Sequence, residues 1–213
     1  MIEKSPLISI LVKNIKDSKD KSLVVIGVHD GLFIKELGRH FKKVFSCYEF
    51  LKIKEIKKGN ICVIKEPFSI TIKKLKNFDV IMFVNEMHHL PDIFQLRTYY
   101  NLKKNQELIL IEWAKKGTLE KFYNYFQYCG QLCDLSKRIL DQMIKQGIVK
   151  IEKKQLFRDE ITFENKKEME AFFKFILPDH YGFGRLSFLK KLNQSRFPLH
   201  LTDVNYFYKI RGI

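Results

Sequence analysis

The turn of the first predicted strand–turn–helix contains two glycines and a histidine, and an acid ends the next predicted strand. The apolar run 22–27 (SLVVIG) ends at Gly27, His29 follows in the turn, and a helix is predicted to begin at Gly31. Glycine permits a positive φ and a close approach of backbone to a ligand, and the start of a helix offers unpaired N–H groups. Glu49 ends the next strand about 20 residues later, where an acid can accept the ribose hydroxyls of a nucleotide. The alternative is an ordinary turn with a solvent-facing Glu49.

Three further residues could hold the base of such a nucleotide. Glu66 ends the third predicted strand, and Pro67 fixes the turn that follows it. A carboxylate at that strand end can accept a hydrogen bond from an exocyclic amino group, and Phe50 could cover the face of the ring. The alternatives are a surface acid before a proline-fixed turn and a phenylalanine in the core.

The segment 85–92 (NEMHHLPD) follows the fourth predicted strand. Asn85 and the residues after it should therefore lie at the carboxyl edge of the sheet, where open α/β sheets hold their ligands. His88 and His89 are the candidate catalytic residues, because a neutral imidazole can take a proton from an acceptor hydroxyl or amine. As neighbours, they are expected to point in different directions. The alternative is a loop that lines the site without proton transfer.

No metal site is predicted. A site built from His88, His89 and a distant cysteine has no support from the spacing of these residues. Cys129 and Cys133 lie four residues apart on one predicted helical face. They are interpreted as small apolar core residues rather than as ligands.

These residues are carried by alternating strand and helix patterns. Nearly continuous apolar runs, typical of strands covered on both faces, occur at 22–27, 44–49, 60–65, 78–84 and 106–113. Helical spacing separates them, which predicts an open, doubly wound α/β sheet of mostly parallel strands. Beyond Trp113, a helix is predicted from a cap at Thr118 to Lys145. A strand at 148–163, helices at 165–177 and 185–193, and a last strand at 203–210 then follow.

In residues 20–115 the chain resembles the class I, seven-strand Rossmann-like family of S-adenosylmethionine-dependent methyltransferases. The segment NEMHHLPD is similar to the LHHLPD segment of a small-molecule group that includes quinone-biosynthesis enzymes. The resemblance implies an antiparallel last strand. We therefore expect a single domain over 1–213, with a core at about 20–115, a helical elaboration at about 118–195 and the last strand at about 203–210.

The resemblance also implies roles for individual residues. Gly27 and Gly31 would lie under the methionine part of S-adenosylmethionine, and Asn85 would lie beside its amino group through its backbone. Glu49 would hold the ribose hydroxyls, and Glu66 with Pro67 would flank the adenine. Two positions depart from the family. His29 replaces a usual glycine, and its imidazole could crowd or bond the cofactor carboxylate, whereas Val25 replaces a frequent acid. A dinucleotide reading fits less well, because it needs a glycine at His29.

The composition limits the class of protein. Charged residues make up 30% and hydrophobic residues 46%, which is typical of a globular chain, and no apolar run is long enough for a membrane span. Four cysteines without a regular framework predict a reducing cytoplasm. The net charge of +15 is spread evenly along the chain rather than concentrated in an arm.

From the resemblance, the predicted function is transfer of a methyl group to a small molecule, with an RNA methyltransferase or a non-catalytic methyltransferase-like scaffold as alternatives. Aromatic residues of the second half could form core, line an acceptor pocket or stack on RNA.

Overall fold

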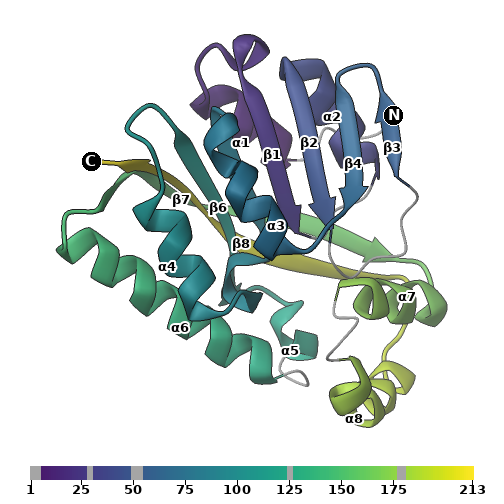
Figure 1. The fold of residues 1–213 in the computed structure, drawn as a ribbon. Helices are drawn as coiled ribbons and strands as arrows, with labels where there is room; N and C mark the ends of the chain where they lie inside the picture. The colour runs from purple at the N-terminus through teal and green to yellow at the C-terminus, as the bar shows by residue number, and fades with distance from the viewer. Residues whose placement is uncertain (1–5, 28–30, 49–54, 124–126, 177–180) are drawn as a thin grey trace.

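A computed structural model of the chain describes residues 6–27, 31–48, 55–123, 127–176 and 181–213. In this part of the chain, one eight-stranded sheet carries helices on both faces (Figure 1). The strands are β1 (Ser22–Gly27), β2 (Lys43–Tyr48), β3 (Ile56–Lys58), β4 (Ile61–Lys65), β5 (Val80–Val84), β6 (Glu107–Lys116), β7 (Val149–Phe163) and β8 (Leu199–Gly212). The helices are α1 (Pro6–Asn14), α2 (Gly31–His40), α3 (Phe68–Thr71), α4 (Asp92–Tyr100), α5 (Glu120–Tyr123), α6 (Gln127–Lys145), α7 (Lys166–Ile176) and α8 (Tyr181–Asn193). Three 3₁₀ turns are η1 (Ser18–Asp20), η2 (Ile72–Asn77) and η3 (Met87–His89).

The strand order is β3-β4-β2-β1-β5-β6-β8-β7. The strands from β4 to β6 pair in parallel, and β3, β8 and β7 join antiparallel. The predicted mostly parallel sheet with an antiparallel last strand is therefore confirmed. The winding direction reverses between β1 and β5, and in such sheets this switch point is where ligands bind, outside the carboxyl ends of the strands.

Both faces of the parallel strands are buried. Val25 packs in a core cluster with residues of α1 and α2, whereas Val24 and Ile26 pack with residues of α3, α4 and α6 on the other face. Alternate residues of one strand thus enter different cores. This explains why the strands are continuously apolar rather than alternating.

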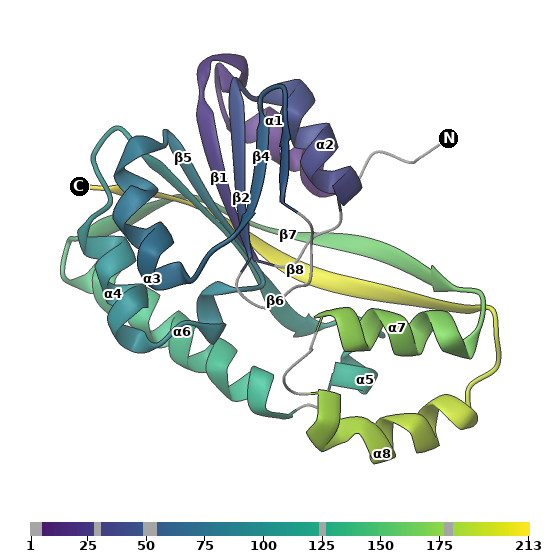
Figure 2. The same ribbon diagram turned by 45° about the vertical axis from the view of Figure 1, so that its right-hand side comes forward.

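The strands β7 and β8 form a long antiparallel pair that extends beyond the parallel part of the sheet (Figure 2). The helices α7 and α8 connect them and pack at the far end of the pair. A third core cluster there contains Phe122, Phe173 and Phe188. Of the three interpretations of these aromatic residues, the core assignment is confirmed for these three.

Three local features differ from the prediction. The helix α1 was not predicted, because nine residues with a short apolar run leave little periodic signal. The edge strand β3 was missed because its three residues are all exposed. The helix predicted from Thr118 is described instead as α5 and α6, with 124–126 outside the described residues. The Thr118 hydroxyl does not cap a helix but accepts a hydrogen bond from the Thr202 N–H at 2.8 Å.

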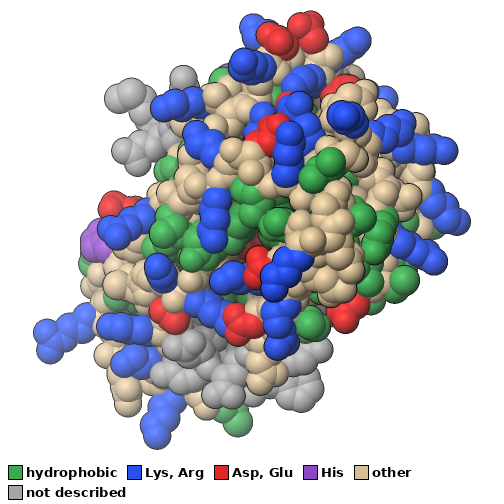
Figure 3. Space-filling model, turned by 90° about the vertical axis from the view of Figure 1, so that its left-hand side faces the viewer, with side chains coloured by type: hydrophobic (Ala, Val, Ile, Leu, Met, Phe, Trp, Pro, Cys, Tyr) green, Lys and Arg blue, Asp and Glu red, His purple; other side chains and the backbone are tan. Residues whose placement is uncertain are grey.

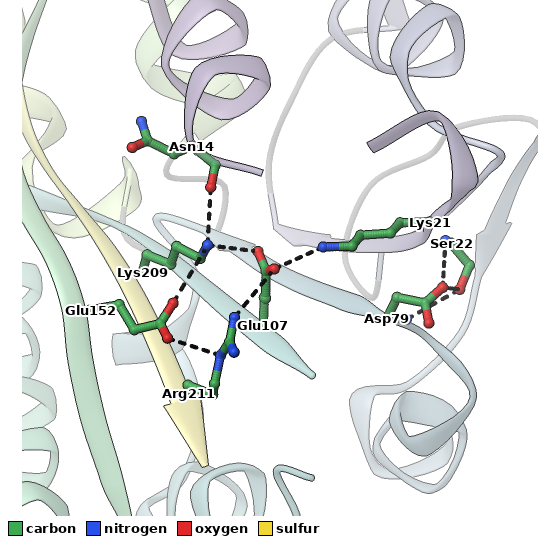
Figure 4. A network of polar contacts seen from close by, with 8 residues as sticks. All are labelled: Asn14, Lys21, Ser22, Asp79, Glu107, Glu152, Lys209 and Arg211. Carbon is green, nitrogen blue, oxygen red and sulfur yellow. Dashed lines mark hydrogen bonds and ion pairs between the residues drawn. The ribbon is translucent and has the colours of Figure 1, made fainter. Parts of the chain in front are cut away.

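Ion pairs hold the amino-terminal edge of the sheet (Figure 4). The Glu107 carboxylate is nearly buried at the start of β6 and contacts Lys21 at 2.8 Å, Lys209 at 3.3 Å and Arg211 at 3.7 Å. Glu152 on β7 pairs with the same two cations of β8. These contacts link β1, β6, β7 and β8 at the edge opposite the switch point.

Lysine and arginine side chains spread across the face shown in Figure 3, with acidic side chains among them. No helix among the described residues combines the length and the apolar character that crossing a membrane requires.

Candidate functional site

The ends of β1 and β5 approach closely at the switch point. Gly27 is in register with Val84, and its φ of 118° lies in a region that other residues avoid. A Cβ at Gly27 would lie 2.3 Å from the Val84 carbonyl oxygen and 2.9 Å from the Glu86 Cβ. Only glycine therefore fits at this point without moving the strand ends apart.

Asn85 follows β5 with a left-handed backbone, at a φ of 51°. Its N–H donates to the carbonyl oxygen of Ile111, within β6, at 2.8 Å. This bond anchors the start of the turn on β6. Its side-chain oxygen Oδ1 is buried and has no hydrogen-bond partner. A buried acceptor without a partner costs about 1–3 kcal/mol, and a hydrogen-bond donor at this point would remove that cost.

The described ends of the first strand–turn–helix agree with the sequence prediction. The strand β1 ends at Gly27 and α2 begins at Gly31. His29, Glu49 and Phe50 lie outside the described residues, and their predicted roles stay predictions.

Glu66 and Pro67 lie directly after β4. The Thr71 hydroxyl donates to Glu66 Oε1 at 2.8 Å, and the Lys74 ammonium pairs with Oε2. The Cys47 thiol donates to the Glu66 carbonyl oxygen at 3.0 Å. Pro67 caps α3, and its carbonyl oxygen accepts the N–H groups of its first turn. The carboxylate is thus held in place by its own segment, and a ligand amino group would add to these partners.

His88 and His89 lie in η3, immediately after the switch point. Their ring centroids are 4.2 Å apart, so the expectation that adjacent histidines point apart is wrong for this tight turn. His88 is buried, and its Nδ1 lies 2.7 Å from Glu112 Oε2 on β6. His89 is partly exposed. The pair therefore presents one buried ring, held by an acid, and one accessible ring.

The Glu112 carboxylate controls the charge of His88. Burial acts to lower the pKa of His88, but the Glu112 charge, together with hydrogen bonds to Cys133 and Glu112, raises it to about 10. At neutral pH the buried ring of His88 is therefore an imidazolium. In that state His88 donates a proton in hydrogen bonds and does not accept one.

A cavity of about 230 Å³ lies beside this pair, between β6, β8, α4 and α6. Its lining includes Tyr99, Glu112, Trp113, Cys133, Tyr206 and Tyr208. The Tyr99 hydroxyl is buried without a hydrogen-bond partner. Burial raises the pKa of Tyr99 above its usual range, and the Glu112 charge raises it further. The cavity offers both apolar and polar groups to a small molecule, or to part of a larger one.

Sequence reasoning missed Glu112 and Tyr99, and interpreted Cys133 as core. Glu112 directly follows the buried residues 107–111 within β6, and a charged residue inside this apolar run was an available signal. Nothing in the spacing of Tyr99 or Cys133 links them to His88, because they lie on different helices, α4 and α6.

The sequence matches no protein-family model and no curated protein. Solved structures, in contrast, match over nearly the whole chain. A Bacillus halodurans protein, provisionally assigned as a methyltransferase, is 15% identical with a TM-score of 0.55, and the match covers 96% of this chain and 97% of that one. An S-adenosylmethionine-dependent methyltransferase from Anabaena variabilis is 14% identical with a TM-score of 0.54, over 98% and 84% of the two chains. The protein has the fold of the class I methyltransferases.

One structural neighbour was solved with ligands. It is phosphoethanolamine N-methyltransferase 2 of Haemonchus contortus in complex with phosphomonomethylethanolamine and S-adenosylhomocysteine. It is 14% identical with a TM-score of 0.51, and the match covers 97% of this chain and 52% of that one. At these identities the likeness shows a shared fold.

Proposed function

We propose that this protein is an S-adenosylmethionine-dependent methyltransferase that acts on a small molecule. The observation that carries the proposal is Asn85, whose buried Oδ1 lacks a donor at the point where the chain reverses its winding. Gly27 lies at the same switch point. Because it has no side chain, the ends of β1 and β5 lie close together and a ligand can approach the backbone there. The fold shared with methyltransferases supports the same assignment.

In this proposal Gly27, Gly31 and Asn85 hold the methionine end of the cofactor, with His29 near its carboxylate. Glu49 accepts the ribose hydroxyls, and Glu66, Pro67 and Phe50 surround the adenine. When bound, S-adenosylmethionine supplies an electrophilic methyl group on a sulfonium sulfur. The protein holds the acceptor in line with that methyl in a site that excludes water, and positioning of this kind can lower the barrier by about 7–11 kcal/mol.

The cavity at Tyr99 and Tyr206 is the proposed acceptor site, because its lining includes Glu112, which contacts His88. We assign His88 and His89 different roles there. His88 lies against Glu112 and positions the neighbouring ring. His89, which is partly exposed, accepts the proton that the acceptor loses. The described cysteines Cys47, Cys62 and Cys133 form no disulfide with one another, and the proposal places the protein in the reducing cytoplasm.

The acceptor class is tested with S-adenosylmethionine labelled in the methyl group. Purified protein is incubated with the low-molecular-weight fraction of a bacterial extract or with total tRNA. We expect the label in a low-molecular-weight product. Label in tRNA would show instead that the even charge of +15 serves RNA binding. In that case, affinity for tRNA should fall steeply between low and physiological salt, because several phosphate contacts release counterions.

A further inference from the structure

We propose that His88, Glu112 and Cys133 form a Zn²⁺ site with a free coordination position on the cavity. One ligand atom of each residue lies within 4.8 Å of the other two. The residues come from η3, β6 and α6, so the fold brings them together from distant parts of the sequence. Glu112 and Cys133 also line the cavity.

The donor set suits zinc. An imidazole nitrogen, a carboxylate oxygen and a thiolate are its protein ligands, and three protein ligands with an open fourth position are typical of catalytic zinc sites. Magnesium and calcium, in contrast, take oxygen ligands in larger numbers. Ligand atoms around tetrahedral zinc lie about 3.3–3.8 Å apart, from the usual bond lengths. The His88 and Glu112 atoms, now 2.7 Å apart, must separate slightly, and the widest pair must close by about 1 Å.

Two buried oxygens indicate that the side-chain cluster is incomplete by itself. The His88 ring occupies Oε2 of Glu112, but Oε1 of the same carboxylate is buried without a partner. The Tyr99 hydroxyl in the cavity wall also lacks one. A purely structural ion pair leaves these atoms unexplained, and buried polar atoms normally find partners. An ion at Glu112, with a bound water or substrate atom in the cavity, provides them.

Such an ion would define the acceptor, and this consequence rests on the proposed function. A hydroxyl or thiol that binds the ion loses its proton more readily, because the metal lowers its pKa, and the partly exposed His89 accepts that proton. The resulting oxygen or sulfur anion attacks the sulfonium methyl carbon. The old carbon–sulfur bond breaks, its electron pair returns to sulfur, and the methylated acceptor and S-adenosylhomocysteine result. The acceptor class is therefore a small molecule with a hydroxyl or thiol group.

The test measures metal binding without any turnover. Full-length protein is stripped with a chelator and titrated with Zn²⁺ against a chromophoric competitor. We expect one ion per chain. In Cys133→Ser and in Glu112→Gln the Zn²⁺ affinity should be at least about 100-fold weaker, because loss of a group that only supports a ligand weakens metal affinity by about 10–100-fold. Cys62→Ser is the matched control, because it removes a partly exposed thiol on β4, several strands away, and should bind within about threefold of wild type.

Cobalt provides a spectroscopic readout of the thiolate ligand. Co²⁺ bound to the wild-type protein should show thiolate-to-cobalt charge-transfer absorption, which Cys133→Ser abolishes. Absence of that absorption, or equal Zn²⁺ affinity in wild type and Cys133→Ser, would overturn the site.

Calorimetry with S-adenosylhomocysteine on the stripped protein separates the zinc proposal from the methyltransferase proposal. Nucleotide binding without metal binding removes the zinc site alone, and the reverse removes the methyltransferase assignment while the zinc site stands.

Discussion

Gly27 and Val84 face each other at the ends of two adjacent parallel strands, and there is no room for a side chain between them. The 2.3 Å that would separate a Gly27 Cβ from the Val84 carbonyl oxygen is far below any real contact. Sequence reasoning attributed this glycine to ligand approach. The structure adds a second reason, which is the contact between β1 and β5 that sets the floor of the candidate site.

Gly27→Ala should therefore both destabilise the protein and weaken cofactor binding. We expect a loss of about 2–4 kcal/mol in the free energy of unfolding, from backbone strain and displaced strand ends. Urea unfolding measures it. Gly59→Ala is the control, because Gly59 also has a positive φ but has open space around it, so it should lose only about 1 kcal/mol. Equal losses in the two variants would show that the contact with Val84 has no cost.

Asn85→Gly should separate stability from binding. Glycine accepts the left-handed backbone and removes the unpartnered Oδ1, so the variant should be as stable as wild type or slightly more stable. Its affinity for S-adenosylhomocysteine should fall about tenfold, equivalent to about 1.4 kcal/mol. Thermal unfolding and calorimetry on the same preparation give both values. A marked loss of stability with unchanged affinity would assign Asn85 to the fold rather than to the site.

Asp203 predicts a stability that depends on pH. Burial raises its pKa above the ordinary 3.8, and the Asp159 charge, opposite it on β7, adds to this. The folded state thus holds the proton more tightly than the unfolded state. The stabilisation from protonated Asp203 is complete below a pH of about 3.8, the pKa of the unfolded state. It is lost as the pH rises through the raised pKa of the folded state.

Asp203→Asn should accordingly be more stable than wild type at pH 7, by on the order of 1 kcal/mol, and no more stable at pH 3.5. The introduced amide can also donate to the Asn205 Oδ1, which now lacks a partner. Denaturant unfolding at the two pH values tests this. A gain of equal size at both would mean that the amide hydrogen bond, and not the charge, is responsible.

Glu107 should be the costliest acid to neutralise at the opposite edge. Glu107→Gln leaves Lys21, Lys209 and Arg211 around an uncharged and nearly buried side chain, which should cost about 3 kcal/mol. Glu152→Gln removes an acid of the same network that is more exposed, and should cost less than about 1 kcal/mol. Urea unfolding of both variants decides whether burial sets the difference, and similar costs would contradict it.

Local pattern was sufficient for the parallel strands of the sheet. Each parallel strand is buried on both faces, so runs such as 22–27 stood out, and Gly147, with a φ of 70°, ends α6 as predicted. The pattern was insufficient where burial is one-sided or slight, as in α1 and β3.

The candidate site divides in the same way. Gly27 and Asn85 could be found because they follow strands directly, and topology alone brings strand ends together. The contact of His88 with Glu112 and Cys133 could not, because it depends on how α6 packs against η3 and β6. Spacing along the chain carries no information about such packing.

The most direct test of the central claim is a calorimetric titration of the wild-type protein with S-adenosylhomocysteine, with NAD as the comparison ligand. We predict saturable binding of one S-adenosylhomocysteine per chain. NAD should not bind, because His29 stands where a dinucleotide site needs glycine. A folded protein that binds no S-adenosylhomocysteine, even at millimolar concentration, would contradict the methyltransferase assignment.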